Sequence, residues 1–198
     1  MRPADPVDAD AVAALIYASA NGMYDRLAGG AGRAPRVIER AFRRPGTSAS
    51  AEVVTVAEVD GAVAAAMAAF PAEEASGRSF AFQRLTLRSI PPWRWPGSLW
   101  LYWIGTRAAP EPPHECLYID ALATYPDRRR RGAASALLAE AEDRARGLGL
   151  RQLALDTSLD NKAARTLYLG EGFEEVAYKP AARGLPGFVA LVKELASR

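Results

Sequence analysis

Residues that hold metals or form disulfides are scarce in this sequence. Its 198 residues include a single cysteine, Cys116, and a single histidine, His114. One cysteine cannot form an intramolecular disulfide, and zinc sites need several Cys or His ligands at characteristic spacings. We therefore expect neither a disulfide-stabilised scaffold nor a metal enzyme.

Long apolar runs and a large excess of one charge are also absent. The longest apolar run, residues 62–70, is far shorter than a membrane span, and aspartates occur near the N-terminus where a secretory signal needs an apolar core. We therefore expect a cytoplasmic protein that does not bind membranes. The formal net charge of +2 is too small to indicate a nucleic-acid partner by itself.

What is present is an ordinary globular composition, with 49% hydrophobic and 24% charged residues. Over a chain of this length, that balance predicts one domain spanning residues 1–198. In the first half, Asp5 is placed to cap a helix, and a second helix is predicted over 34–44. Two β-rich runs over about 52–59 and 62–70 flank an Asp-Gly dipeptide, which is typical of a tight hairpin.

The second half alternates between strand and helix signals. We expect a strand over 116–124, a helix from about 132 to 146, a strand at "RQLALDT", a helix at "NKAARTLYLG", and two strands at "GFEEVAYK" and "GFVALVKEL". This alternation predicts an α/β fold in which at least two neighbouring strands are parallel and are joined by a crossover helix.

The stretch between the two halves, about 76–113, differs from both. It contains five arginines, one acidic residue and all the tryptophans, Trp93, Trp95, Trp100 and Trp103. We expect two helical pieces around a Pro/Trp turn. The tryptophans have three interpretations: they cover apolar surface, form a homodimer contact, or form a lid over a substrate.

The segment "PDRRRRGAASALL", residues 126–138, joins a predicted strand to the next helix. The first N–H groups of a helix have no intrahelical partner and lie at the positive end of its dipole, so a turn at this place can hold phosphates. Glycine and alanines at 132–134 leave the backbone open to a ligand, and Ser135 adds a hydroxyl. The arginines at 128–131 are either a solvated turn or extra cations for that ligand. No groove-reading or base-stacking element accompanies them, so we expect no nucleic-acid partner.

This segment fits the R/Q-x-x-G-x-G/A signature of the GNAT superfamily of acyl-CoA-dependent N-acetyltransferases, with Arg129, Gly132 and Ala134 in its fixed places. The strand before it, "LYIDALATYP", is similar to the family's fourth strand. "DNKAARTLYLGEGF", residues 160–173, is similar to the later family motif N-x-x-A-x-x-L-Y-x-x-x-G-F. Order, spacing and predicted elements agree over about 115–179, so the chain resembles this family.

The resemblance implies a single-domain α/β fold. Its sheet would be mixed and mostly antiparallel, with a parallel pair of central strands, helices on its flanks, and the helical insert before the fourth strand. It also implies acetyl-CoA as cosubstrate, no metal, and transfer of the acetyl group to a primary amine of a small molecule or peptide by direct attack in a ternary complex. The alternative is a non-catalytic acyl-CoA-binding protein with a regulatory or sensor role.

The same resemblance implies where the cosubstrate binds. Backbone amides from about Arg130 to Ser135 would bind its pyrophosphate, and the strand edge from Leu122 to Thr124 would pair with its pantetheine arm. Asn161 would reach it, unless that residue only caps its helix. The implied acetyl-CoA-binding residues are Leu122, Ala123, Thr124, Arg129, Arg130, Arg131, Gly132, Ala133, Ala134, Ser135 and Asn161.

Two residues are candidates for proton transfer. Tyr168 matches the family tyrosine that protonates the departing thiolate, and a phenol with a pKa of about 10 is protonated at neutral pH. The alternative is that Tyr168 only packs in the core. The amine must lose a proton before it attacks, and Asp120 is our candidate base. In a strand of period two, Asp120 shares a face with Tyr118 and Leu122, and partial burial would raise the pKa of its carboxyl. The alternative for Asp120 is a hydrogen-bonded structural carboxylate.

Other polar residues are weaker candidates. Glu115, just outside the strand, and Asp156, at the end of the next strand, are the other carboxylates considered as the base. His114, beside prolines, is more typical of a loop residue than of a base, and Cys116 is typical of a small core residue. The positive charge of the insert suits an acceptor that carries a carboxylate or a phosphate better than it suits a polyamine.

Overall fold

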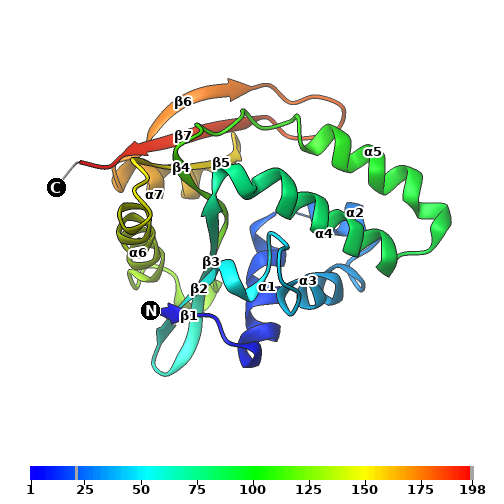
Figure 1. Cartoon of the computed structure of the whole chain (residues 1–198), viewed down its shortest axis with the longest axis horizontal. Helices are drawn as coiled ribbons and strands as arrows, with labels where there is room; N and C mark the ends of the chain where they lie inside the picture. Colours follow the sequence, from blue (N-terminus) through cyan, green and yellow to red (C-terminus); the bar gives the residue numbers. More distant parts are fainter. Residues whose placement is uncertain (21, 197–198) are drawn as a thin grey trace.

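A mixed sheet organises the chain, as the computed structural model of residues 1–20 and 22–196 shows (Figure 1). Across the described residues the strand order is β1-β2-β3-β4-β5-β7-β6. The strands are β1 (Arg2–Pro3), β2 (Val54–Val59), β3 (Ala62–Pro71), β4 (Cys116–Thr124), β5 (Gln152–Ser158), β6 (Glu174–Lys179) and β7 (Phe188–Glu194). Only β4 and β5 pair in parallel, and the other neighbours are antiparallel. The expected fold class is confirmed.

Helices cover both faces of the sheet (Figure 1). They are α1 (Ala9–Ser19), α2 (Met23–Ala28), α3 (Ala34–Phe42), α4 (Ala75–Ser89), α5 (Trp95–Gly105), α6 (Ala133–Gly147) and α7 (Lys162–Gly170). On one face α1, α3 and α4 bury apolar side chains against β2 and β3, and on the other α6 and α7 pack against β3, β4 and β5. The sheet therefore separates two apolar cores.

The hairpin between β2 and β3 forms at the predicted Asp-Gly dipeptide. Asp60 and Gly61 both have positive φ, 54° and 75°, which is the backbone of the hairpin turn that Asn-Gly and Asp-Gly favour. The strand that follows is rich in alanine because both of its faces are covered. Ala64 to Phe70 are buried, and small side chains let helices approach the sheet from either side.

The insert consists of two helices, as expected, α4 and α5, joined through a turn at Pro91–Arg94. The short helix α2 was not predicted. It has six residues and lies between Gly22 and Gly29, which have φ of 79° and 75°. A helix of this length is too short to show apolar periodicity, so the two glycines are the only local signal for it. It contacts α5, α3 and α4, and these tertiary contacts hold it in place.

Candidate active site

The centre of the sheet opens where β4 and β5 separate. Their parallel ladder runs only from Cys116 opposite Gln152 to Ile119 opposite Leu155. Beyond this point β4 stays paired with β3, and β5 stays paired with β7. The edge of β4 that faces β5 is therefore unpaired from Asp120 to Thr124, and its backbone groups are available to an extended ligand.

Asp120 lies at the point where this opening begins, in a β-bulge. Ile119 pairs with Ala69 and Ala121 pairs with Ala68, which leaves Asp120 without a partner on β3. The bulge reverses the alternation of side chains along β4. Tyr118 packs with Cys116 in one cluster, whereas Leu122 belongs to the core under α6. The expectation that Asp120 shares a face with Tyr118 holds, since both line the wider cavity. The expectation that Leu122 lies on the same face is wrong, because strict period two does not survive an extra residue.

Two cavities meet at the opening. The narrower one, about 270 Å³, is lined by the separated strand ends and by Asn161 and Tyr168. The wider one, about 820 Å³, lies beneath the insert and is lined by parts of α2, α4, α5 and the loop that follows α5. Both cavities are lined by Asp120 and Asp156. The carboxylate pair therefore stands where a ligand in one cavity would meet a ligand in the other.

The environment of this pair raises the pKa of both carboxyls. The Asp120 side chain faces the open cavities, but protein atoms surround it on the other sides. This burial and the nearby charge of Asp156 raise the pKa of its carboxyl to about 7. A hydrogen bond with Ser48 partly opposes this shift. Burial also raises the pKa of Asp156, although the hydroxyl of Tyr118 donates a hydrogen bond to its carboxylate. A carboxyl with a pKa near neutrality is suited to general-base catalysis.

Tyr168 is buried in α7, and its ring packs against that of Phe173 at 5.7 Å between centroids. Burial and the charge of Asp156 raise the pKa of its phenol to about 12, so it is protonated at neutral pH. Tyr168 therefore packs in the core, and it also lines the narrower cavity.

Asn161 caps α7, since its Oδ1 accepts a hydrogen bond from the N–H of Ala164 at 3.3 Å. Its Nδ2 donates to the hydroxyl of Thr157 on β5, also at 3.3 Å. The Asn161 side chain also lines the narrower cavity, so it both caps α7 and forms part of the cavity wall. The predicted contact of Asn161 with acetyl-CoA stays a prediction.

The segment after β4 forms an open turn at the start of α6. Arg130 and Gly132 both have positive φ, 61° and 77°. The first bond of the helix runs from the N–H of Ala136 to the carbonyl of Gly132 at 2.9 Å, so the N–H groups of Ala133 to Ser135 have no partner within the helix. A Cβ at Gly132 would meet nothing within 4 Å. The turn thus presents open backbone donors at a helix N-terminus, which suits phosphate binding.

The arginines of this turn have different roles. Arg128 donates to the carbonyl of Val59 at 2.6 Å, and Arg131 pairs with Asp60 at 3.0 Å, so both hold the turn against the β2–β3 hairpin. Arg129 and Arg130 are exposed, and within the described residues they have no ion pair or side-chain hydrogen bond. Arg129 and Arg130 are therefore the arginines of this turn whose side chains are available to a phosphate ligand.

The weaker candidates fall in three places. His114 is exposed and lines the wider cavity. Glu115 is exposed at the start of β4 and is not among the described residues that line either cavity. Cys116 is fully buried, and burial raises the pKa of its thiol to about 11, so the expectation of a core residue is confirmed.

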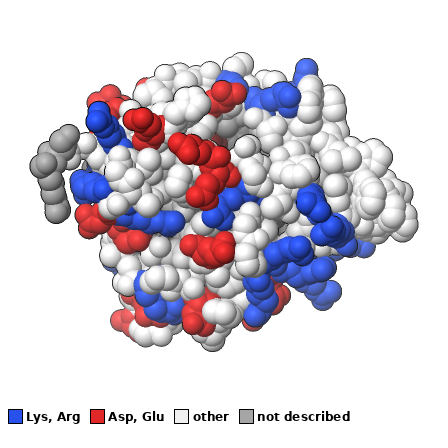
Figure 2. Space-filling view, viewed as in Figure 1, with Lys and Arg blue, Asp and Glu red and all other residues white. Residues whose placement is uncertain are grey.

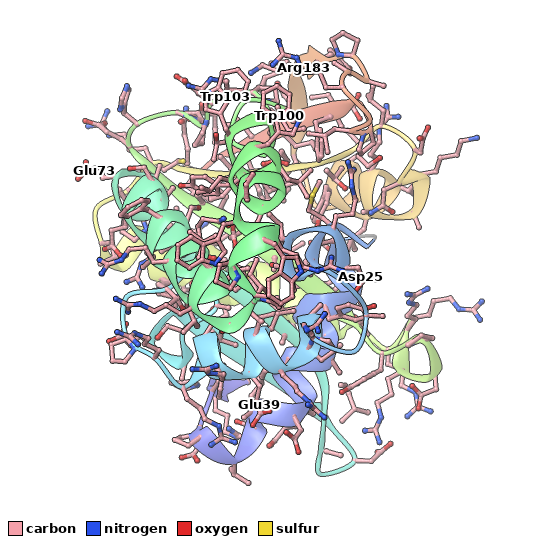
Figure 3. All side chains as sticks on the ribbon, turned by 90° about the vertical axis from the view of Figure 1, so that its right-hand side faces the viewer. Asp25, Glu39, Glu73, Trp100, Trp103 and Arg183 are labelled. Carbon is pink, nitrogen blue, oxygen red and sulfur yellow. The ribbon has the colours of Figure 1, made fainter. Side chains whose placement is uncertain are left out.

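The insert lines the wider cavity, but its tryptophans do not. Trp93, Trp95, Trp100 and Trp103 are 79%, 42%, 55% and 41% exposed, and Trp100 stacks on Trp103 at 5.3 Å. Figure 3 shows this pair at one end of α5 with Arg183 beside it, well apart from Glu73 at the start of α4. No described tryptophan lines the wider cavity; α5 contributes Leu101 and Tyr102 to its wall instead. The homodimer contact stays a prediction.

The positive charge of the insert is not in that cavity either. No arginine or lysine is among the described residues that line it, whereas Glu73, Glu111, Asp120 and Asp156 are. The expectation that the insert favours an acceptor with a carboxylate or phosphate therefore does not hold for this cavity. Sequence reasoning also missed Tyr24 of α2 and Ser48, both of which line the cavity. Neither lies in a recognisable motif, and only the packing of α2 and α4 brings them there.

Comparison with known proteins connects this geometry to a family. The model of the acetyltransferase (GNAT) family matches residues 32–173, which is well over half of the chain. The chain belongs to the GNAT acetyltransferase family. This GNAT chain is similar to an N-acetyltransferase of Staphylococcus aureus Mu50, whose crystal structure is 22% identical and has a TM-score of 0.75, with 96% of this chain and 98% of that chain covered.

Two curated relatives match a shorter part of the GNAT chain. An uncharacterized N-acetyltransferase of Bacillus subtilis is 36% identical over 37% of this chain and 47% of its own length. The aminoglycoside N(6')-acetyltransferase type 1 of Klebsiella aerogenes is 40% identical over 30% of this chain and 40% of its own length. The similarity to both therefore spans less than half of each relative.

Acetyl-CoA fits the features that this GNAT chain presents. The open turn at Gly132 supplies backbone hydrogen-bond donors for phosphate groups. The unpaired edge of β4 supplies backbone groups that an extended chain can pair with. The narrower cavity is lined both by that edge and by the carboxylate pair. Among the described residues no group of three or more His, Cys, Asp or Glu is placed to hold a metal ion. None of the described helices has the length and hydropathy needed to cross a membrane.

Proposed function

We propose that this protein is an N-acetyltransferase that moves an acetyl group from acetyl-CoA to a primary amine while both are bound. In this proposal the turn at Arg129 to Ser135 binds the pyrophosphate, the edge Leu122 to Thr124 pairs with the pantetheine arm, and the amine approaches through the wider cavity. Membership of the GNAT family supports the acetyl donor, and the names of both curated relatives support an amine acceptor.

When bound, acetyl-CoA supplies a thioester whose acetyl carbon forms the new C–N bond as its C–S bond breaks. Asp120 would take a proton from the ammonium form of the acceptor, which frees the nitrogen lone pair. Tyr168 would give its phenolic proton to the departing sulfur and recover one from the nitrogen as the amide forms. Of the two protons that the ammonium loses, one therefore ends on sulfur and the other leaves through Asp120 to solvent.

The observation that carries the proposal is the position of the carboxylate pair. Asp120 and Asp156 line both cavities, so the residue with a pKa of about 7 stands between the two ligands rather than behind one of them. Tyr168 lines only the narrower cavity, on the side where the sulfur would lie. A base on the amine side and an acid on the donor side match the two proton transfers of the reaction.

The test is release of free thiol from acetyl-CoA with a panel of primary amines, measured beside acetyl-CoA binding by calorimetry. Binding together with amine-dependent thiol release supports the proposal. Binding without release for every acceptor would support the non-catalytic acyl-CoA sensor instead, and absence of binding would contradict both. Mass spectrometry of the product distinguishes N-acetylation from thioester hydrolysis, because only the former adds an acetyl group to the amine.

A further inference from the structure

The charges of the insert are sorted between its two sides. The insert has five arginines and one acidic residue, yet the wider cavity beneath it is lined by carboxylates alone among charged groups other than His114. On the face that Figure 2 shows, Lys and Arg gather toward the lower right and acidic side chains lie nearer the centre.

Three of the five arginines of the insert have contacts outside the cavity, and the other two are exposed on α4. Arg78 binds Glu74 at 2.6 Å, and Arg107 lies over the ring of Trp103 at 4.5 Å. Arg94 lies against Gly29, at the end of α2. Arg84 and Arg88 of α4 are exposed, whereas Phe82 and Leu85 of the same helix are buried. Among the described residues that line the cavity, no Lys or Arg therefore neutralises its carboxylates.

The four carboxylates form two pairs according to the cavities that they line. Asp120 and Asp156, the inner pair, line both the wider and the narrower cavity. Glu73, just before α4, and Glu111, in the loop after α5, are the outer pair; both are exposed and line the wider cavity but not the narrower one. Within the described residues neither Glu73 nor Glu111 has a hydrogen bond or ion pair to a cationic side chain. The outer pair is thus available to a ligand, and the inner pair serves the reacting nitrogen.

Apolar and aromatic side chains form much of the remaining wall of the wider cavity. They include Tyr24, Phe82, Leu101, Tyr102 and Phe188. The rings of Tyr24 and Phe82 pack against each other at 5.7 Å, so this wall is partly preformed. A hydrocarbon chain or ring fits such a wall, and aromatic faces also attract cations. The cavity therefore combines carboxylates with an apolar and aromatic wall.

We propose that the acceptor is a primary amine with at least one further protonated nitrogen, separated from the first by an apolar chain or ring. The inner carboxylates receive the nitrogen that is acetylated, and Glu73 and Glu111 hold the second cation. This inference rests on the proposed function, since it names the acceptor class of that site. Opposite charges across a cavity set specificity by favouring one partner and disfavouring others that carry a like charge.

The experiment compares three acceptors of equal chain length: hexamethylenediamine, hexylamine and ε-aminocaproate. They end in an ammonium, a methyl and a carboxylate respectively. We expect kcat/KM for thiol release to fall in that order, with about a tenfold advantage of the diamine over hexylamine, which corresponds to about 1.4 kcal/mol. The advantage should shrink as salt is added, because screening weakens exposed charge pairs.

Two variants locate the effect. In the double variant Glu73→Gln/Glu111→Gln, the ratio of kcat/KM for the diamine to that for hexylamine should fall toward one, mainly through KM. Glu74→Gln is the matched control, because Glu74 is the neighbouring acidic residue, is paired with Arg78, and is not among the described lining residues. Its ratio should equal that of the wild-type protein. Equal loss of the ratio in both would contradict the assignment of the outer carboxylates.

A binding measurement separates failure of this inference from failure of the proposed function. Thermal shift of the protein without acetyl-CoA should show a larger rise in Tm with hexamethylenediamine than with hexylamine. If that holds while no amine releases thiol, the transferase proposal fails and the cation site stands. Thiol release with equal use of all three acceptors, or a preference for ε-aminocaproate, would overturn the cation site and leave the transferase proposal standing.

Discussion

The two ends of the candidate site are built in opposite ways. The turn at residues 128–135 is made by consecutive residues, and its proposed function depends on backbone N–H groups at the start of α6. The wider cavity is lined by side chains from α2, α4, α5, β4, β5 and the loop after α5. An acetyl donor shared by a whole family can be bound by one type of backbone turn. An acceptor amine that differs between members must be selected by side chains. The proposed pyrophosphate-binding turn is therefore local in the sequence, whereas the proposed acceptor cavity is assembled by tertiary packing.

The largest effect on acetyl-CoA binding is expected from a side chain that blocks the turn at Gly132. Gly132→Trp should abolish detectable acetyl-CoA binding in calorimetry, because the indole would occupy the space in front of the free N–H groups. Gly132→Ala is the matched control, since it has the same backbone strain at φ 77° but adds only one carbon with nothing within 4 Å. Acetyl-CoA binding by Gly132→Ala should stay within about tenfold of wild type. Unchanged affinity in Gly132→Trp would remove the turn from the donor site.

The next largest effect is expected on turnover, from the loss of Tyr168 as the proposed general acid. Tyr168→Phe should lower kcat by about a hundredfold or more while acetyl-CoA affinity stays close to wild type, because the ring packing is kept and only the phenolic proton is lost. Single-turnover thiol release and calorimetry measure the two quantities. A fully active Tyr168→Phe protein would show that another group, or water, protonates the sulfur.

Asp120 gives a prediction that depends on pH. Its pKa of about 7 means that the basic form accumulates above neutrality, so the activity of the wild-type protein relative to Asp120→Asn should rise about tenfold from about pH 6 to about pH 8. Dividing by the variant removes the titration of the amine itself. A ratio that does not change with pH would exclude Asp120 as the base.

The same pKa predicts a pH-dependent stability. In the unfolded chain an aspartate ionises near a pKa of about 3.9, so between that pH and about 7 the folded protein binds more protons than the unfolded one. The carboxyl therefore lowers the free energy of unfolding progressively as pH rises through this range. The Tm of Asp120→Asn should exceed that of wild type by more at about pH 8 than at about pH 5. Parallel curves would contradict the raised pKa.

The smallest effects are expected within the arginine run. Arg128→Ala should lower the free energy of unfolding by about 1 kcal/mol, because a charged hydrogen bond to the carbonyl of Val59 is lost. Arg131→Ala should change it by less than about 0.5 kcal/mol, since both partners of its pair with Asp60 are exposed. Urea denaturation measures both. Equal effects would show that the hairpin contact of Arg128 adds nothing to stability.

Much of the fold could be predicted because its signals are local. The Asp-Gly turn, the helix cap at Asp5 and the strand–turn–helix at 116–146 all depend on neighbouring residues, and each is where it was expected. The bulge at Asp120 could not be predicted, because it depends on the register of β4 against β3. For the same reason Tyr118 and Leu122 were assigned to one face when they pack in different clusters.

The sequence by itself determined the parts of the site that one segment can make alone: the turn at Gly132, the cap at Asn161 and the position of Tyr168 in α7. Net charge over 76–113 pointed toward an anionic acceptor, but the tertiary structure leaves no described Lys or Arg in the wall of the wider cavity and places four carboxylates there. The physical reason is that a charge acts through distance and orientation, and these are set by packing. The arginines of the insert lie away from the wider cavity, whereas carboxylates from distant segments of the chain line it.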